Sequence, residues 1–202
     1  MGLYHLGAVR ALKDEGLLPE ILSGASAGSL VAAFTCTRTD EELDRDLRPE
    51  VLQPKFVCCA RPWPQRIKSL VKHGHMFDNA EWLELVKWFT CGDLTFREAY
   101  AKTGRTLCIT LSTVTKNAPP ILLNHKSAPH VLVRSAVVAS ASMVGLLGRA
   151  RLLAKGPDGK VVALQQEYWD GSIAQVSGAV GGGRPSFVWP SLYAVHAAST
   201  IA

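Results

Sequence analysis

The sequence lacks any apolar run long enough to span a bilayer. Its most apolar segment, residues 135–148, lies between Arg134 and Arg149 and contains three serines. A buried helix that runs into a loop explains this segment better than a membrane span does. The N-terminal residues, Met1 to His5, also lack the basic start and long apolar stretch of a signal peptide.

Metal-binding patterns are scarce as well. The cysteines are odd in number and show no C-x-x-C spacing; they are Cys36, Cys58, Cys59, Cys91 and Cys108. This pattern favours reduced thiols in an intracellular protein over a disulfide framework or a zinc site. His73 and His75 have no third ligand nearby in the sequence, which favours a solvated loop. We expect neither a metal nor an organic cofactor.

Charge is moderate and its balance is basic. The chain has 202 residues, of which 48% are hydrophobic and 19% charged, so it can form one domain with a real core. The net charge of +5 permits contact with an anionic surface. Gly181 to Gly183 lack the Lys-Ser/Thr of a phosphate loop, and the basic stretch lacks the interleaved aromatics of a nucleic-acid binder. No nucleic-acid partner is expected.

Residues 23–29, with the sequence SGASAGS, fit the pattern G-x-S-x-G. In this pattern a serine lies on a sharp turn between a strand and a helix. Pro19 to Ser23 is the candidate strand, and Ala27 to Phe34 is the candidate helix. Gly24 and Gly28 flank Ser26 where strand and helix cross, while Ala25 and Ala27 complete the motif. The pattern predicts that Ser26 lies at the positive end of the helix. A chance turn of small residues is the alternative.

Other local signals predict alternating helices and strands, which is typical of an α/β fold with a sheet covered on both faces. Helices are expected at Leu6 to Glu15, Asp40 to Leu47, from a capping box at Asp78 to Gly92, from a box at Thr95 to Gly104, and at Pro129 to Ser140. Strands are expected at Arg105 to Thr115, Pro120 to Asn124, Arg151 to Ala154 and Lys160 to Leu164.

Asp170, in the stretch Tyr168 to Ser172, is the second candidate for chemistry. An Asp-Gly pair is weak evidence by itself, because most such pairs are turns. Serine hydrolysis nevertheless needs a base for the hydroxyl proton. That base is either a histidine oriented by an aspartate or a carboxylate that acts directly.

Several stretches, in the same order, resemble the patatin-like acyl hydrolases. The chain is most similar to their branch of intracellular triacylglycerol lipases, the sugar-dependent oil-body lipases. The matching stretches are residues 2–12, 17–19 with the serine motif, 94–100, 103–105, 129–131, 135–140 and 169–172. The likeness covers about residues 2–175.

The resemblance implies a three-layer α/β/α sandwich and a Ser/Asp dyad without histidine. Ser26 resembles the nucleophile and Asp170 the general base, with Gly171 and Ser172 in the same motif. It also implies an acyl-enzyme intermediate, no cofactor, and a neutral lipid or phospholipid as substrate, most closely triacylglycerol. Residues 135–148 resemble the segment that packs beside the site. The implied location is cytoplasmic, or peripheral on a membrane or lipid droplet.

The sequence departs from this family at both ends. The family begins with a strand and a glycine-rich loop that supplies the oxyanion hole, and here only Gly2 matches the last glycine of that loop. Residues 176–202 match nothing and form a Gly/Ala/Ser-rich tail after the partial domain at residues 1–175. We therefore expect a fragment, truncated at the N-terminus and divergent at the C-terminus, that hydrolyses esters poorly by itself.

Two other functions remain open. Ser26, Asp170 and His196 occur in the chain order of an α/β-hydrolase triad. A non-catalytic lipid-surface module is the third possibility. It is favoured by the basic segment Lys55 to His75, which contains no acidic residue. This basic segment is either an amphipathic surface segment that lies on a membrane or an ordinary helix docked on the core.

Replacing Arg66, Lys68 and Lys72 by Glu should test the membrane interpretation. Each basic side chain near an anionic surface contributes about 1 kcal/mol, so affinity for anionic vesicles should fall by about a hundredfold or more in low salt. Vesicle co-sedimentation measures this, and added salt should remove the difference between the two proteins. Unchanged binding in low salt would identify the segment as a merely solvated face.

Overall fold

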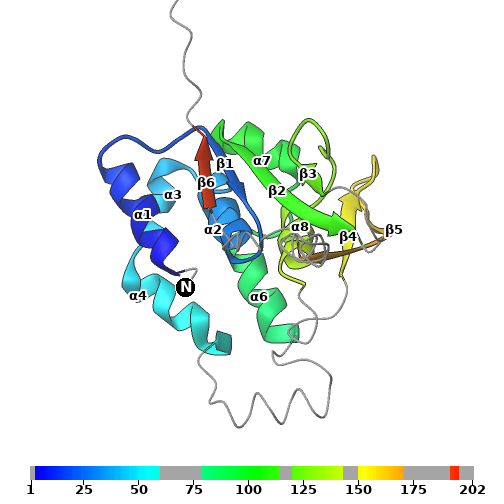
Figure 1. Ribbon diagram of the computed structural model, residues 1–202, viewed down its shortest axis with the longest axis horizontal. Helices are drawn as coiled ribbons and strands as arrows, with labels where there is room; N and C mark the ends of the chain where they lie inside the picture. Colours follow the sequence, from blue (N-terminus) through cyan, green and yellow to red (C-terminus); the bar gives the residue numbers. More distant parts are fainter. Residues whose placement is uncertain (1–2, 60–78, 114–119, 143–149, 171–191, 196–202) are drawn as a thin grey trace, which may run out of the picture.

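A mixed β-sheet forms the centre of the molecule (Figure 1). The computed structural model describes residues 3–59, 79–113, 120–142, 150–170 and 192–195. The strands are β1 (Ile21–Gly24), β2 (Thr106–Thr113), β3 (Ile121–Leu123), β4 (Ala150–Lys155), β5 (Val161–Asp170) and β6 (Leu192–Val195). The helices are α1 (Leu3–Asp14), α2 (Ala27–Cys36), α3 (Asp40–Asp46), α4 (Pro49–Leu52), α6 (Asn79–Phe89), α7 (Phe96–Thr103) and α8 (Val133–Ser140), with a 3₁₀ segment η1 (Gln53–Cys59).

The strand order is β4-β5-β2-β1-β6, and β3 also pairs with β2. β1 and β2 run parallel, with Gly24 opposite Ile109. All the other described strand pairs are antiparallel. The register places Asp170 of β5 opposite Leu111 of β2. β3 pairs with one edge of β2 at both Ile109 and Leu111, so β1 and β5 share the other edge: β1 lies beside Thr106 to Ile109 and β5 beside Leu111 to Thr113.

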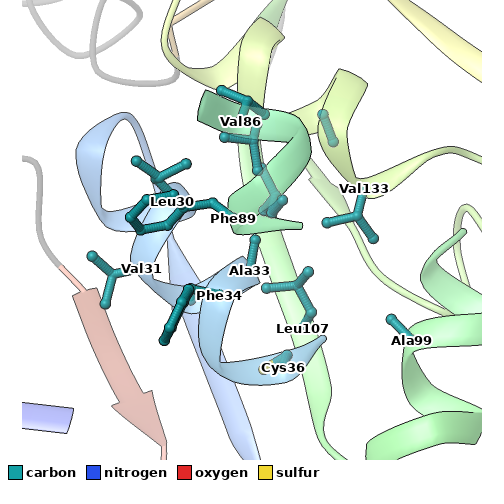
Figure 2. Close-up of a cluster of buried hydrophobic side chains, with 14 of the residues drawn as sticks. Leu30, Val31, Ala33, Phe34, Cys36, Val86, Phe89, Ala99, Leu107 and Val133 are labelled. Atoms are coloured by element: carbon teal, nitrogen blue, oxygen red, sulfur yellow. The ribbon is translucent and has the colours of Figure 1, made fainter. Parts of the chain in front are cut away.

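Helix α2 is the most deeply buried helix of the described part. Its sequence, AGSLVAAFTC, contains no charged residue, and every residue from Gly28 to Cys36 is buried. Small side chains let the helix lie close to the sheet, while Phe34 contacts Phe89 of α6 with ring centroids 5.2 Å apart. Figure 2 shows side chains of α2 directed toward α6 and toward Leu107 of β2. These helices on a mixed sheet form the predicted α/β sandwich.

Most of the local predictions are confirmed. Thr95 forms both bonds of a capping box with Glu98, and the helix that follows ends at Gly104 in the left-handed conformation. The predicted strands at 105–115, 120–124, 151–154 and 160–164 correspond to β2, β3, β4 and β5. Asp78, the Gly181 to Gly183 stretch and most of the basic segment lie outside the described residues.

Three predictions of extent need correction. α8 begins at Val133 and not at Pro129, because Val131 and Leu132 form bridges with Ala154 and Thr95. β5 continues past residue 164 to Asp170, since its far half pairs with β4 and β2. β6, within the stretch taken as a tail, was not predicted; it pairs with β1.

None of the described helices is long and apolar enough to cross a membrane.

Arg38, which follows α2, links the end of that helix to α3 and α6. Only 2% of its surface is exposed, and its Nε donates to Asp46 Oδ2 at 2.9 Å. Its other nitrogens donate to the carbonyl oxygens of Phe89 and Trp88, both at 2.8 Å. A buried charge of this kind requires its partner, because an unpaired guanidinium is costly in a dry interior. The hydrogen bonds from Arg45 and from Arg38 hold the pKa of Asp46 below its usual value, against the effect of burial.

Asp46→Asn should therefore change the acid limb of the stability curve. A carboxyl with a lowered folded-state pKa stabilises the protein above about pH 4, and this contribution is lost as the pH falls through the folded-state pKa. We expect the variant to lose about 3 kcal/mol at pH 7 and to show a flatter dependence below pH 4. Urea unfolding at several pH values measures both effects. Asp158→Asn, at an exposed carboxylate, is the control. Equal pH profiles for Asp46→Asn and wild type would contradict the expectation.

Candidate active site

Ser26 lies between β1 and α2 in a backbone conformation that L-residues rarely adopt. Its φ is 50° and its ψ is −127°, and it occupies the N-cap position of α2 without a side-chain cap bond. Such a conformation costs about 1–3 kcal/mol and persists only where the surroundings hold it. The predicted strand-turn-helix conformation is confirmed, and the hydroxyl of Ser26 is not used in capping the helix.

The elbow, residues 24–28, requires a glycine at position 24. A Cβ on Gly24 would lie 2.4 Å from the carbonyl oxygen of Gly28 and 2.7 Å from the nitrogen of Ser29. Neither backbone atom can move as a side chain would. The Gly28 N–H donates to the carbonyl of Ala25 at 2.9 Å, which closes the turn. The strand and the helix thus approach each other at the van der Waals limit.

Two serine hydroxyls support the backbone of Ser26. Ser29 Oγ donates to the carbonyl oxygen of Ser26 at 2.6 Å. On the other side, the Ser26 N–H donates to Ser140 Oγ at 2.9 Å, and Ser140 Oγ donates to the carbonyl oxygen of Thr110, also at 2.9 Å. The peptide groups on both sides of Ser26 are therefore tied to α2, α8 and β2.

The sheet brings the backbone of Asp170 to the level of Ser26. Gly24 pairs with Ile109, and Asp170 pairs with Leu111. Since β1 and β2 are parallel, Ser26 and Leu111 are each two residues beyond that pair. Because β3 fills the opposite edge of β2, β1 and the end of β5 follow one another along the same edge, and their partners Ile109 and Leu111 are two residues, about 7 Å, apart. Gly2, Gly171, Ser172 and His196 lie outside the described residues.

Ser140 and Ser29 are the residues that inspection of the sequence missed. Ser29 follows the motif directly, but nothing in the pattern G-x-S-x-G demands a hydroxyl there. Ser140 is separated from Ser26 by 114 positions, so no spacing rule connects them. The only signal in the sequence that concerned Ser140 was the resemblance of residues 135–148 to a segment that packs beside the site.

The described residues offer no evident metal site, since no three of their His, Cys, Asp or Glu side chains are grouped to hold an ion. Three of the cysteines, Cys36, Cys91 and Cys108, are free thiols. Burial raises the pKa of Cys36 to about 12, so this thiol is neutral at physiological pH and is no candidate nucleophile.

Comparison with known proteins identifies a family that this chain matches. Residues 1–179 match the family described as patatin-like phospholipase. Fungal proteins named as patatin-like phospholipase domain-containing are similar to this chain. One from Cryptococcus neoformans is 44% identical over 79% of the chain, one from Yarrowia lipolytica 41% over 84%, and one from Aspergillus niger 40% over 84%. These alignments cover 18%, 21% and 23% of the respective relatives, so the chain spans about a fifth of their length.

Gly24→Ala should destabilise the protein, because the new methyl group would meet the backbone of α2. Overpacking against atoms that cannot rotate away costs about 1–3 kcal/mol or more. Gly7→Ala is a matched control: a Cβ there meets nothing within 4 Å, and alanine favours a helix such as α1. Urea unfolding of both variants measures the difference. Wild-type stability of Gly24→Ala would mean that β1 and α2 are not in this close contact.

Proposed function

The chain belongs to the patatin-like phospholipase family, and we propose on that premise that it carries a lipid acyl hydrolase site, with Ser26 as nucleophile and Asp170 as general base. The single observation that supports this most directly is the strained backbone of Ser26 at the strand-to-helix turn. Strain of this kind accumulates where a side chain must be presented for chemistry. A serine that merely capped the helix would adopt an ordinary extended backbone.

The proposed reaction passes through an acyl-enzyme. Ser26 Oγ attacks the ester carbonyl carbon while its proton moves to the carboxylate of Asp170. The C–O bond to the alcohol then breaks, and the alcohol leaves with that proton. Water attacks the acyl-enzyme with Asp170 again accepting a proton, the fatty acid leaves, and Ser26 regains its hydrogen.

The N-terminus of α2 supports the negative charge that develops in this reaction. Ser26 immediately precedes this ten-residue helix, whose positive end favours an anion. An aspartate with an ordinary pKa near 3.9 is a weak base for a hydroxyl, so the dyad depends on such electrostatic help. The ends of β1 and β5 pair with the same edge of β2 at positions two residues apart, which supports a nucleophile and a base from these two strands.

The finer assignment is triacylglycerol as substrate, with a peripheral site of action on a lipid droplet or membrane. It is supported by the resemblance to the oil-body lipase branch and by the net charge of +5. An anionic lipid surface attracts a basic protein and concentrates it at its substrate.

The triad alternative, with His196 as base, is disfavoured by the direction of β6. This strand runs antiparallel to β1, and Val195, the last described residue before His196, pairs with Ile21. Ile21 is at the opposite end of β1 from Ser26, about 16 Å along an extended chain. We therefore favour Asp170 over His196 as the general base.

Three substitutions test the assignment. Ser26→Ala should abolish hydrolysis of an emulsified triacylglycerol and of a p-nitrophenyl ester. Asp170→Asn should lower kcat by about 10²–10⁴-fold, the usual contribution of a positioned base. His196→Ala should leave the rate unchanged. Labelling by a fluorophosphonate probe, followed by peptide mass spectrometry, locates the nucleophile.

Asp158→Asn serves as the matched control, because this carboxylate lies in the exposed turn between β4 and β5. Full activity of Asp170→Asn, or a loss in His196→Ala as large as that expected for Asp170→Asn, would contradict the dyad. Vesicle binding that persists in Ser26→Ala, combined with no hydrolysis by the wild type, would instead identify a lipid-surface binding module.

A further inference from the structure

The elbow leaves the sheet where β1 ends, and the register shows which hydrogen bond is interrupted there. Thr106 pairs with Ile21, and the Thr106 N–H donates to the carbonyl of Glu20 at 2.7 Å. In a parallel ladder every second residue of one strand bonds to the other. Continued in this register, the carbonyl of Thr110 would accept from the N–H of Ser26.

The hydroxyl of Ser140 occupies this interrupted position. The Ser26 N–H and the Thr110 carbonyl do not bond to each other; each bonds to Ser140 Oγ at 2.9 Å. A hydroxyl has one hydrogen and two lone pairs, so it donates to Thr110 and accepts from Ser26. Ser140 is fully buried, and its hydroxyl bonds directly to both groups.

We propose that Ser140 is a positioning residue for Ser26: its hydroxyl is inserted between Ser26 N–H and Thr110 C=O and sets how far the elbow stands from the edge of β2. The inference rests on the proposed function for its effect on catalysis. The bridge itself is a matter of geometry and can be tested without any activity.

Without the hydroxyl of Ser140, the Ser26 N–H and the Thr110 carbonyl have two unfavourable arrangements. The Ser26 N–H and the Thr110 carbonyl either close onto each other, which draws the elbow toward β2, or remain buried without partners, which destabilises the strained turn. Both arrangements displace the nucleophile. A displacement of about 1 Å lowers the rate on the order of a hundredfold.

Ser140→Ala in the 202-residue chain tests the proposal with two measurements. Hydrogen exchange at the Ser26 amide reports the bridge directly, and we expect faster exchange in the variant. The reaction of Ser26 with a fluorophosphonate and the hydrolysis of a p-nitrophenyl ester report the nucleophile. We expect the labelling rate and kcat to fall about a hundredfold with KM unchanged. Ser140→Cys, which fills the space with a weak hydrogen-bonding group, should behave as Ser140→Ala does and covers the case in which alanine does not fold.

Ser135→Ala is the matched control. Ser135 is buried on the same helix and has the same double bonding, but it donates to Leu132 and accepts from the N–H of Leu153 in β4. Its loss should reduce stability and leave exchange at Ser26 and kcat close to wild type. Unchanged exchange at Ser26 together with an unchanged labelling rate and kcat in Ser140→Ala, or an equal fall of kcat in Ser135→Ala, would overturn the proposal. If the wild type is not labelled at Ser26, the proposed function fails, and the exchange measurement still decides whether Ser140 holds the elbow.

Discussion

The contact between Gly24 and Gly28 is the constraint on which the rest of the structure depends. β1 can turn into α2 within two residues only if no side chain separates them, and a Cβ at position 24 would lie 2.4 Å from a backbone oxygen. This close approach leaves Ser26 in its rare backbone conformation. The strain is local, but the atoms that sustain it come from three other places in the chain.

The hydrophobic core supports the elbow from behind. α2 carries no charged residue and is buried along almost its whole length, against Phe89 of α6 and Leu107 of β2 (Figure 2). At its far end, Arg38 binds Asp46 and the last carbonyls of α6. A helix held at both ends cannot shift along its axis to relieve the turn. A packed interior responds to strain by transmitting it, so the elbow keeps its geometry.

The sheet relates the elbow to Asp170. β1 and β5 pair with the same edge of β2, because β3 fills the other, and Gly24 and Asp170 lie opposite Ile109 and Leu111 although 144 residues separate Ser26 from Asp170 (170 − 26). This shared edge brings the end of β5 to the end of β1. The proposed Ser/Asp dyad depends on this register of β1 and β5 against one strand, β2.

The sequence alone determined the elements whose signals are local. The glycines around Ser26 predicted the turn, and the pair Thr95 and Glu98 predicted the start of α7. Capping bonds and tight turns involve residues within a few positions of each other, so their chemistry is visible in the chain. The resemblance to a family, and with it Ser26 and Asp170 as candidates, was visible for the same reason.

Only the tertiary structure decided what joins these elements. Val131 and Leu132 form isolated bridges with Ala154 and Thr95, so α8 begins only after them. The tertiary structure also extends β5 to Asp170 and buries Arg38 against α6. It also placed Ser140 between Ser26 and Thr110. Each of these depends on strand register and on contacts between distant segments. Periodicity within one segment carries no information about which carbonyl or amide will lie opposite it.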